Sequence, residues 1–283
     1  MKVCMKIFRY LPVLIVLCVL CTAAGAESYV EEDHDGIGIY KSDPSSYEKV
    51  RALGGRVVTV AGGPPFFVHW IPEGFEKTEK KRLLVVLHGT GGNAYRHLLN
   101  FTDVASRKGF AIASIQWGWP ARQPSAKKKE YTYLSNSADT YRIVAGAVQY
   151  LSAHYGVDTS LTAWLGFSRS ATQCASFAFH DKESGNNYIR LFIAASGGVS
   201  PNLPAVRLLL SGRYGEKPLS GTHFYLWGGL RDTTRGENMM RSRDLIEKLG
   251  GTVDILRIGP EGHGGFNHRK EYQIEAVDLW YSL

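Results

Sequence analysis

Short apolar runs that alternate with helix-like segments constrain the fold of this chain most. The run Leu83–Leu87 is continuously apolar, which is typical of a strand buried on both faces of a sheet. Strands are predicted over residues 66–71, 83–87, 111–116, 161–167, 189–195, 223–227 and 252–258, and a possible edge strand over 57–60. Helices are predicted over residues 94–107, 138–155, 170–180, 235–249 and 269–282. This regular order predicts an α/β fold with a mainly parallel sheet covered by helices on both faces.

The first 26 residues have the layout of a secretory signal peptide. Basic residues at positions 2, 6 and 9 precede an apolar stretch from Leu11 to Cys21, and small residues follow at Ala24–Ala26. Cleavage after Ala26 would leave residues 27–283 as one α/β domain in a secreted or periplasmic protein, without stable membrane insertion. An uncleaved anchor is the alternative, but the apolar stretch is shorter than the roughly 20 residues that cross a bilayer.

The charge of the chain argues against one class of partner, and its cysteine content argues against an internal disulfide. The 33 basic and 26 acidic side chains give a formal charge of +7, and removal of residues 1–26 takes away three basic groups, so 7 − 3 = +4 remains. This mild excess does not indicate nucleic-acid binding, and the basic run Lys127–Lys129 is interpreted as a solvated loop. Only Cys174 follows residue 26, so the mature chain has no internal disulfide. The oligomeric state stays open.

Ser168 lies on a predicted turn between a buried strand and a helix. A nucleophile on such a sharp turn needs small neighbours two positions away on each side, and Gly166 and Ser170 meet that need. Ser170 stands where glycine is commoner. The alternative is that Ser168 only caps the following helix.

A glycine-rich turn, His88–Gly92, follows the apolar strand at 83–87. Glycines let the backbone turn tightly and direct N–H groups at one point, which is how an oxyanion is stabilised in acyl transfer. We expect the backbone N–H groups of Arg169 and Thr90 to form this oxyanion hole, with Gly91 as the alternative to Thr90.

Asp232 and His263 each follow a predicted strand, so both should lie at the strand carboxyl ends beside Ser168. In this arrangement Ser168 is the nucleophile, His263 the general base and Asp232 the group that orients the base. The order Ser, Asp, His along the chain is that of α/β-hydrolases. His268 is the alternative base, and Cys174 is a remote alternative nucleophile. No histidines pair at metal-ligand spacing, so no metal is predicted.

These segments give the chain its resemblance to the α/β-hydrolases. The matching stretches read FFVHWIP, LLVVLHGTGG, HYGVDTS, LGFSRS, WGGLRDTT and GPEGHGGF, and together they span about residues 64–283. The chain is most similar to dienelactone-hydrolase-like enzymes, polyhydroxybutyrate-depolymerase-like esterases and feruloyl or acetyl-xylan esterases. The resemblance implies the fold and a serine esterase without a cofactor, but it does not define the substrate.

The long connection between residues 116 and 138 is the place where the sequence suggests substrate contacts. It begins at a strand carboxyl end and contains Trp117 and Trp119, together with Lys127–Lys129. We expect the two tryptophans to form an aromatic wall for a small or polysaccharide-linked ester, or else only to anchor the loop. A feruloyl or acetyl ester is the first expectation and a short polyester the second. A serine peptidase of the same fold and a non-catalytic binding protein remain alternatives.

Overall fold

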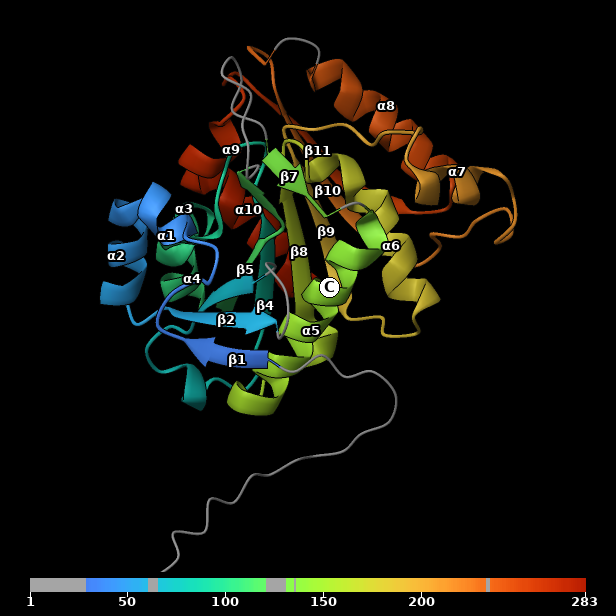
Figure 1. Cartoon of the computed structure of the whole chain (residues 1–283). Coiled ribbons are helices and arrows are strands. Elements are labelled where there is room, and N and C mark those ends of the chain that lie inside the picture. The colour runs from blue at the N-terminus through green and yellow to red at the C-terminus, as the bar shows by residue number, and fades with distance from the viewer. Residues whose placement is uncertain (1–28, 61–65, 121–130, 135, 233–234) are drawn as a thin grey trace, which may run out of the picture.

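A nine-stranded sheet forms the centre of the molecule in a computed structural model, which describes residues 29–60, 66–120, 131–134, 136–232 and 235–283 (Figure 1). The strand order is β1-β2-β3-β5-β4-β8-β9-β10-β11. The strands are β1 (Tyr29–Glu32), β2 (Arg56–Val60), β3 (Phe66–Trp70), β4 (Leu83–Leu87), β5 (Ala111–Gln116), β8 (Thr162–Phe167), β9 (Ile189–Ala195), β10 (His223–Gly229) and β11 (Thr252–Gly259). Strands β5 to β11 in this order are parallel, and β1, β2 and β3 add to the edge as antiparallel strands.

Helices cover both faces of the sheet. They are α1 (Ile39–Ser42), α2 (Pro44–Ala52), α3 (Ala94–Leu99), α4 (Thr102–Lys108), α5 (Ser137–Tyr155), α6 (Cys174–Glu183), α7 (Pro204–Leu210), α8 (Arg235–Lys248), α9 (Gly265–His268) and α10 (Lys270–Ser282). Figure 1 shows α2, α3, α4 and α10 on one side of the strands and α5, α6 and α8 on the other. The predicted α/β fold class is therefore confirmed.

Successive side chains of a strand belong to two different hydrophobic cores, one on each face of the sheet. In β4, Leu83, Val85 and Leu87 pack with α5 and α6, whereas Leu84 and Val86 pack with α3, α4 and α10. A strand with an apolar layer on each face must be apolar throughout, which explains why Leu83–Leu87 contains no polar residue.

Several elements differ from the sequence prediction. The helix predicted over 94–107 is two helices, because the chain turns at Asn100 and Phe101 between α3 and α4. The strand predicted at 57–60 is not an edge strand, since β1 pairs with its outer side. The short helices α1, α2, α7 and α9 were not predicted. They carry too few residues for a helical period to be read from the sequence.

The long connection after β5 folds back on itself. Gly118–Pro120 (β6) pairs antiparallel with Tyr131–Tyr133 (β7), so these described parts of the connection form a two-stranded ribbon. Lys127–Lys129 lies outside the described residues, as does the predicted signal peptide. Of the helices that the structure describes, none is long and apolar enough to cross a membrane.

Candidate active site

Ser168 occupies a strained turn at the carboxyl end of β8. Its φ is +56°, a left-handed conformation that non-glycine residues rarely adopt. The Ser168 N–H donates to the carbonyl oxygen of Ala195 at 2.8 Å, which ties the turn to the neighbouring strand β9. Gly197 lies against the same turn, because a Cβ there would approach the Ser168 carbonyl oxygen to 2.2 Å. The structure thus has the sharp strand-to-helix turn that the sequence predicted.

Ser170 stands where glycine is commoner, and its hydroxyl stabilises the turn. Its Oγ accepts from the Phe167 N–H at 2.8 Å and donates to the Leu87 carbonyl oxygen at 2.7 Å, and it is fully buried. The hydroxyl therefore links the end of β8 to the end of β4, where the turn His88–Gly92 begins. A glycine at this position could not make these two hydrogen bonds.

Asp232 and His263 reach Ser168 from the ends of β10 and β11. His263 Nε2 lies 2.8 Å from Ser168 Oγ, and His263 Nδ1 lies 2.6 Å from Asp232 Oδ2. A carboxylate can only accept, so the imidazole donates from Nδ1 to Asp232 and its Nε2 is free to accept the hydroxyl proton of Ser168. This arrangement can increase the nucleophilicity of a serine. The three residues that the sequence selected are brought together in this order.

Two contacts hold the loop that carries His263. Sequence reasoning missed both. Ser196 has a φ of +57°, and its Oγ donates to the His263 carbonyl oxygen at 2.5 Å. The Glu261 carbonyl oxygen accepts the Arg231 N–H at 3.0 Å and so joins the loops that carry His263 and Asp232. No motif marks Ser196 in the sequence; only its place directly after the buried strand β9 could have suggested it.

The two expected oxyanion donors lie on turns next to Ser168. A Cβ at Gly89 would approach Ser168 Cβ to 2.9 Å, so the turn His88–Gly92 packs directly on Ser168. Among the described residues, no hydrogen bond uses the backbone N–H of Thr90 or Arg169. The Gly91 N–H, in contrast, donates to the hydroxyl of Tyr133 at 3.1 Å. The structure therefore favours Thr90 over Gly91.

Trp117 and Trp119 have different environments. Trp117 is 1% exposed, and its Nε1 donates to the His88 carbonyl oxygen at 2.9 Å. This burial removes Trp117 from the expected aromatic wall and makes it an anchor for the turn at His88. Trp119 is half-buried. Tyr133 packs on Trp117, with ring centroids 4.7 Å apart, and the Arg169 guanidinium lies 4.3 Å from the centre of the Tyr133 ring.

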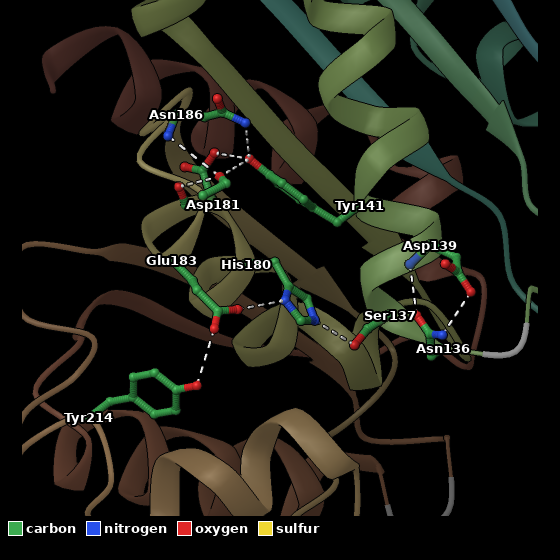
Figure 2. Close-up of polar contacts among 10 residues, drawn as sticks. Asn136, Ser137, Asp139, Tyr141, His180, Asp181, Glu183, Asn186 and Tyr214 are labelled. Atoms are coloured by element: carbon green, nitrogen blue, oxygen red, sulfur yellow. Dashed lines mark hydrogen bonds and ion pairs between the residues drawn. The ribbon is translucent and has the colours of Figure 1, made fainter. Parts of the chain in front are cut away.

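A second serine–histidine–carboxylate chain lies between α5 and α6 (Figure 2). Ser137 Oγ is 2.9 Å from His180 Nε2, and His180 Nδ1 is 3.6 Å from Glu183 Oε2. Glu183 also accepts a hydrogen bond from Tyr214 at 3.1 Å. Ser137 is the first residue of α5 and follows Asn136, whose backbone is extended, and the His180–Glu183 distance exceeds that of a hydrogen bond. This chain therefore serves as an internal comparison for Ser168.

The other sequence candidates, His268 and Cys174, do not contact Ser168 among the described residues. His268 is exposed, and it is His263 that contacts Ser168. Cys174 is buried, and burial raises the pKa of its thiol to about 12, so it stays protonated near neutral pH. Within the described ranges, no three histidine, cysteine, aspartate or glutamate side chains gather where a metal ion could bind.

Comparisons with known proteins place this geometry in a structural class. The sequence matches no model of a protein family and no curated protein. One of two fungal esterases from Rhizomucor miehei superposes with a TM-score of 0.59 at 16% identity, covering 87% of this chain and 89% of that one. The esterase from Pyrobaculum calidifontis gives 0.56 at 18%, covering 86% and 90%. An S-formylglutathione hydrolase from Agrobacterium tumefaciens gives 0.59 at 12%, covering 81% and 96%.

These likenesses, together with the sheet order and the strained serine turn, define the class. The chain has the α/β-hydrolase fold. At these identities the superpositions show the fold alone, so the activity of the chain must be argued from its own site.

The tight turn at Ser168 leaves no space for a side chain at Gly166, so a substitution there should destabilise the protein. A Cβ at this position would meet Trp164 Cη2 at 2.3 Å and the backbone nitrogen of Ala171 at 2.8 Å, and the backbone cannot yield easily. We expect Gly166→Ala to lower the free energy of unfolding by about 2–3 kcal/mol, as overpacking a buried site does. Gly36→Ala is the control, because no atom lies within 4 Å of the added Cβ. Urea unfolding that gives equal stabilities for both variants would contradict this description of the turn.

Proposed function

We propose that this protein is an exported carboxylic-ester hydrolase that works through an acyl-enzyme on Ser168. The observation that carries the proposal is the continuous contact from Ser168 Oγ to His263 and from His263 to Asp232, at 2.8 Å and 2.6 Å. The left-handed φ of Ser168 supports it, because such strain is found where the surrounding structure holds a residue in place for function.

The mechanism follows from this geometry. His263 takes the proton of Ser168, whose oxygen attacks the ester carbonyl carbon, and the N–H groups of Thr90 and Arg169 bind the oxyanion that forms. His263 then gives its proton to the departing alcohol, which leaves an acyl group on Ser168. Water that loses a proton to His263 attacks this acyl-enzyme, and His263 returns the proton to Ser168 Oγ as the acid is released. Asp232 holds the imidazole and stabilises its charged form.

Replacing the nucleophile tests the proposal. Ser168→Ala should lower the kcat for p-nitrophenyl acetate by at least about 10³-fold, and His263→Ala should cost about as much, because such residues act as a unit. Ser137→Ala is the matched control, since Ser137 also contacts a histidine at 2.9 Å, and it should keep activity within about twofold. If Ser168→Ala retained a tenth of the activity, the assignment of the nucleophile would be wrong.

The substrate we propose is a short ester with an aromatic or sugar-linked part, such as a feruloyl or acetyl ester of a polysaccharide, and a short polyester comes second. Trp119, which is half-buried, is the residue of the expected aromatic wall that can still meet a substrate. We expect methyl ferulate to have a higher kcat/KM than a long-chain p-nitrophenyl ester, and Trp119→Ala to lower kcat/KM for methyl ferulate by about tenfold. A preference for the long chain, or no effect of the variant on any substrate, would contradict this.

Export is proposed from the sequence of residues 1–26. Cleavage after Ala26 should leave Glu27 as the first residue, two positions before β1 begins at Tyr29. Mass spectrometry of the protein recovered from the medium or periplasm of an expressing bacterium measures the mature N-terminus directly. An intact Met1, or a lipid on Cys18 or Cys21, would contradict the proposal.

A further inference from the structure

Ser196 has a strained backbone that its residue type does not explain. Three non-glycine residues among those that the structure describes have a left-handed φ, and they are Ser168, Asn187 and Ser196. Asparagine adopts this conformation more readily than most residues, and the Asn187 side chain donates to the carbonyl oxygen of Gly185, two positions before it. Glycine would adopt the φ of +57° at position 196 without strain. The strain at Ser196 therefore calls for a role of its side chain.

The hydrogen bonds of Ser196 and its neighbour Ala195 join the segments that carry the candidate triad. Ser196 is fully buried and directly follows β9. Its N–H donates to the Trp227 carbonyl oxygen at 2.9 Å, and its Oγ donates to the His263 carbonyl oxygen at 2.5 Å. The Ala195 carbonyl oxygen accepts the Ser168 N–H at 2.8 Å. Two consecutive residues thus hold the Ser168 turn, the His263 loop and β10, the strand before the triad aspartate.

The His263 loop needs such a contact from outside. The His263 side chain is 42% exposed, and the residue lies between Gly262 and Gly264, whose backbones are less restricted than those of other residues. The imidazole must still keep its Nε2 at 2.8 Å from Ser168 Oγ. The hydroxyl of Ser196 bonds the carbonyl oxygen of the histidine itself, and it does so from the end of a buried strand in the middle of the sheet.

We propose that Ser196 is a positioning residue for the reaction. Its hydroxyl fixes the backbone of His263 and so keeps the imidazole Nε2 directed at Ser168, although Ser196 contacts no reacting atom. A displacement of about 1 Å in a catalytic group can lower a rate about 10²-fold, so one hydrogen bond to the base residue is enough to matter. This inference rests on the proposed ester hydrolysis, because it assigns a role in the same site.

Two substitutions separate the hydroxyl of Ser196 from its strain. Ser196→Ala removes the hydroxyl but keeps a Cβ at a left-handed residue, whereas Ser196→Gly removes the hydroxyl and the strain. Both should lower the kcat for p-nitrophenyl acetate at least about tenfold and leave KM within about threefold, because His263 serves the formation and the hydrolysis of the acyl-enzyme. Thermal unfolding should nevertheless give Ser196→Gly a Tm at least about 2 °C above that of Ser196→Ala.

Asn187 provides the matched control at the other end of β9. It is exposed, lies two positions before β9 begins at Ile189, and also uses its side chain to bond a backbone carbonyl. Asn187→Ala and Asn187→Gly should show the same order of Tm as the Ser196 pair, with kcat within about twofold of the wild-type value.

The pattern across the four variants decides between positioning and stability. If Ser196 served stability alone, activity would follow Tm, and Ser196→Gly would be clearly more active than Ser196→Ala. That result, an undiminished kcat in both Ser196 variants, or an equal loss in the Asn187 variants would each overturn the inference. If Ser196→Ala does not fold, the comparison of Ser196→Gly with Asn187→Gly decides the matter, since glycine fits both positions without strain.

Crystal structures keep the inference separate from the proposed function. In Ser196→Gly the distance from His263 Nε2 to Ser168 Oγ should exceed the hydrogen-bond limit of about 3.2 Å, while the bond from the Ser168 N–H to Ala195 persists. An unchanged distance would overturn the inference even if the variant were inactive. If the wild-type protein hydrolysed no ester, the proposed function would fail, but this distance would still show whether Ser196 positions His263.

Discussion

The left-handed backbone of Ser168 is the constraint on which the rest of the site depends. A non-glycine residue in this conformation costs about 1–3 kcal/mol and persists only where its surroundings hold it. Here the surroundings are the bond to Ala195, the close approach of Gly197 and the hydroxyl of Ser170. Each comes from β9, from the segment just after it or from the turn itself, so the sheet holds the half-buried serine at its carboxyl edge.

The register of the parallel strands places the carboxyl ends of β4, β8, β9 and β10 at the same height in the sheet. Leu87 of β4 pairs with Gly166 of β8, and Gly166 pairs with Ala194 of β9. Ala195 in turn pairs with Trp227 of β10. The segments that follow these strands carry the turn His88–Gly92, Ser168, Ser196 and Asp232. Parallel strands end at one edge of the sheet. The strand order alone therefore brings together four segments that are far apart in the sequence.

Much of this arrangement could be predicted from the sequence, and the failures have physical causes. Buried parallel strands are mainly apolar, so β4 and β9 were predicted with their observed bounds. Ser168, Asp232 and His263 were selected because they follow such strands. The break between α3 and α4 was missed, and the sequence left open whether Trp117 contacts a substrate or only anchors its loop, since both depend on tertiary packing that local spacing does not encode.

Covalent labelling of the nucleophile tests the central claim most directly. A fluorophosphonate reacts only with a serine whose hydroxyl has been activated, so intact-mass measurement should find one adduct per chain, and peptide mapping should place it on Ser168. The adduct should disappear in His263→Ala and persist in Ser137→Ala, although Ser137 also contacts a histidine. An adduct on another residue, or no adduct on the folded wild-type protein, would contradict the account.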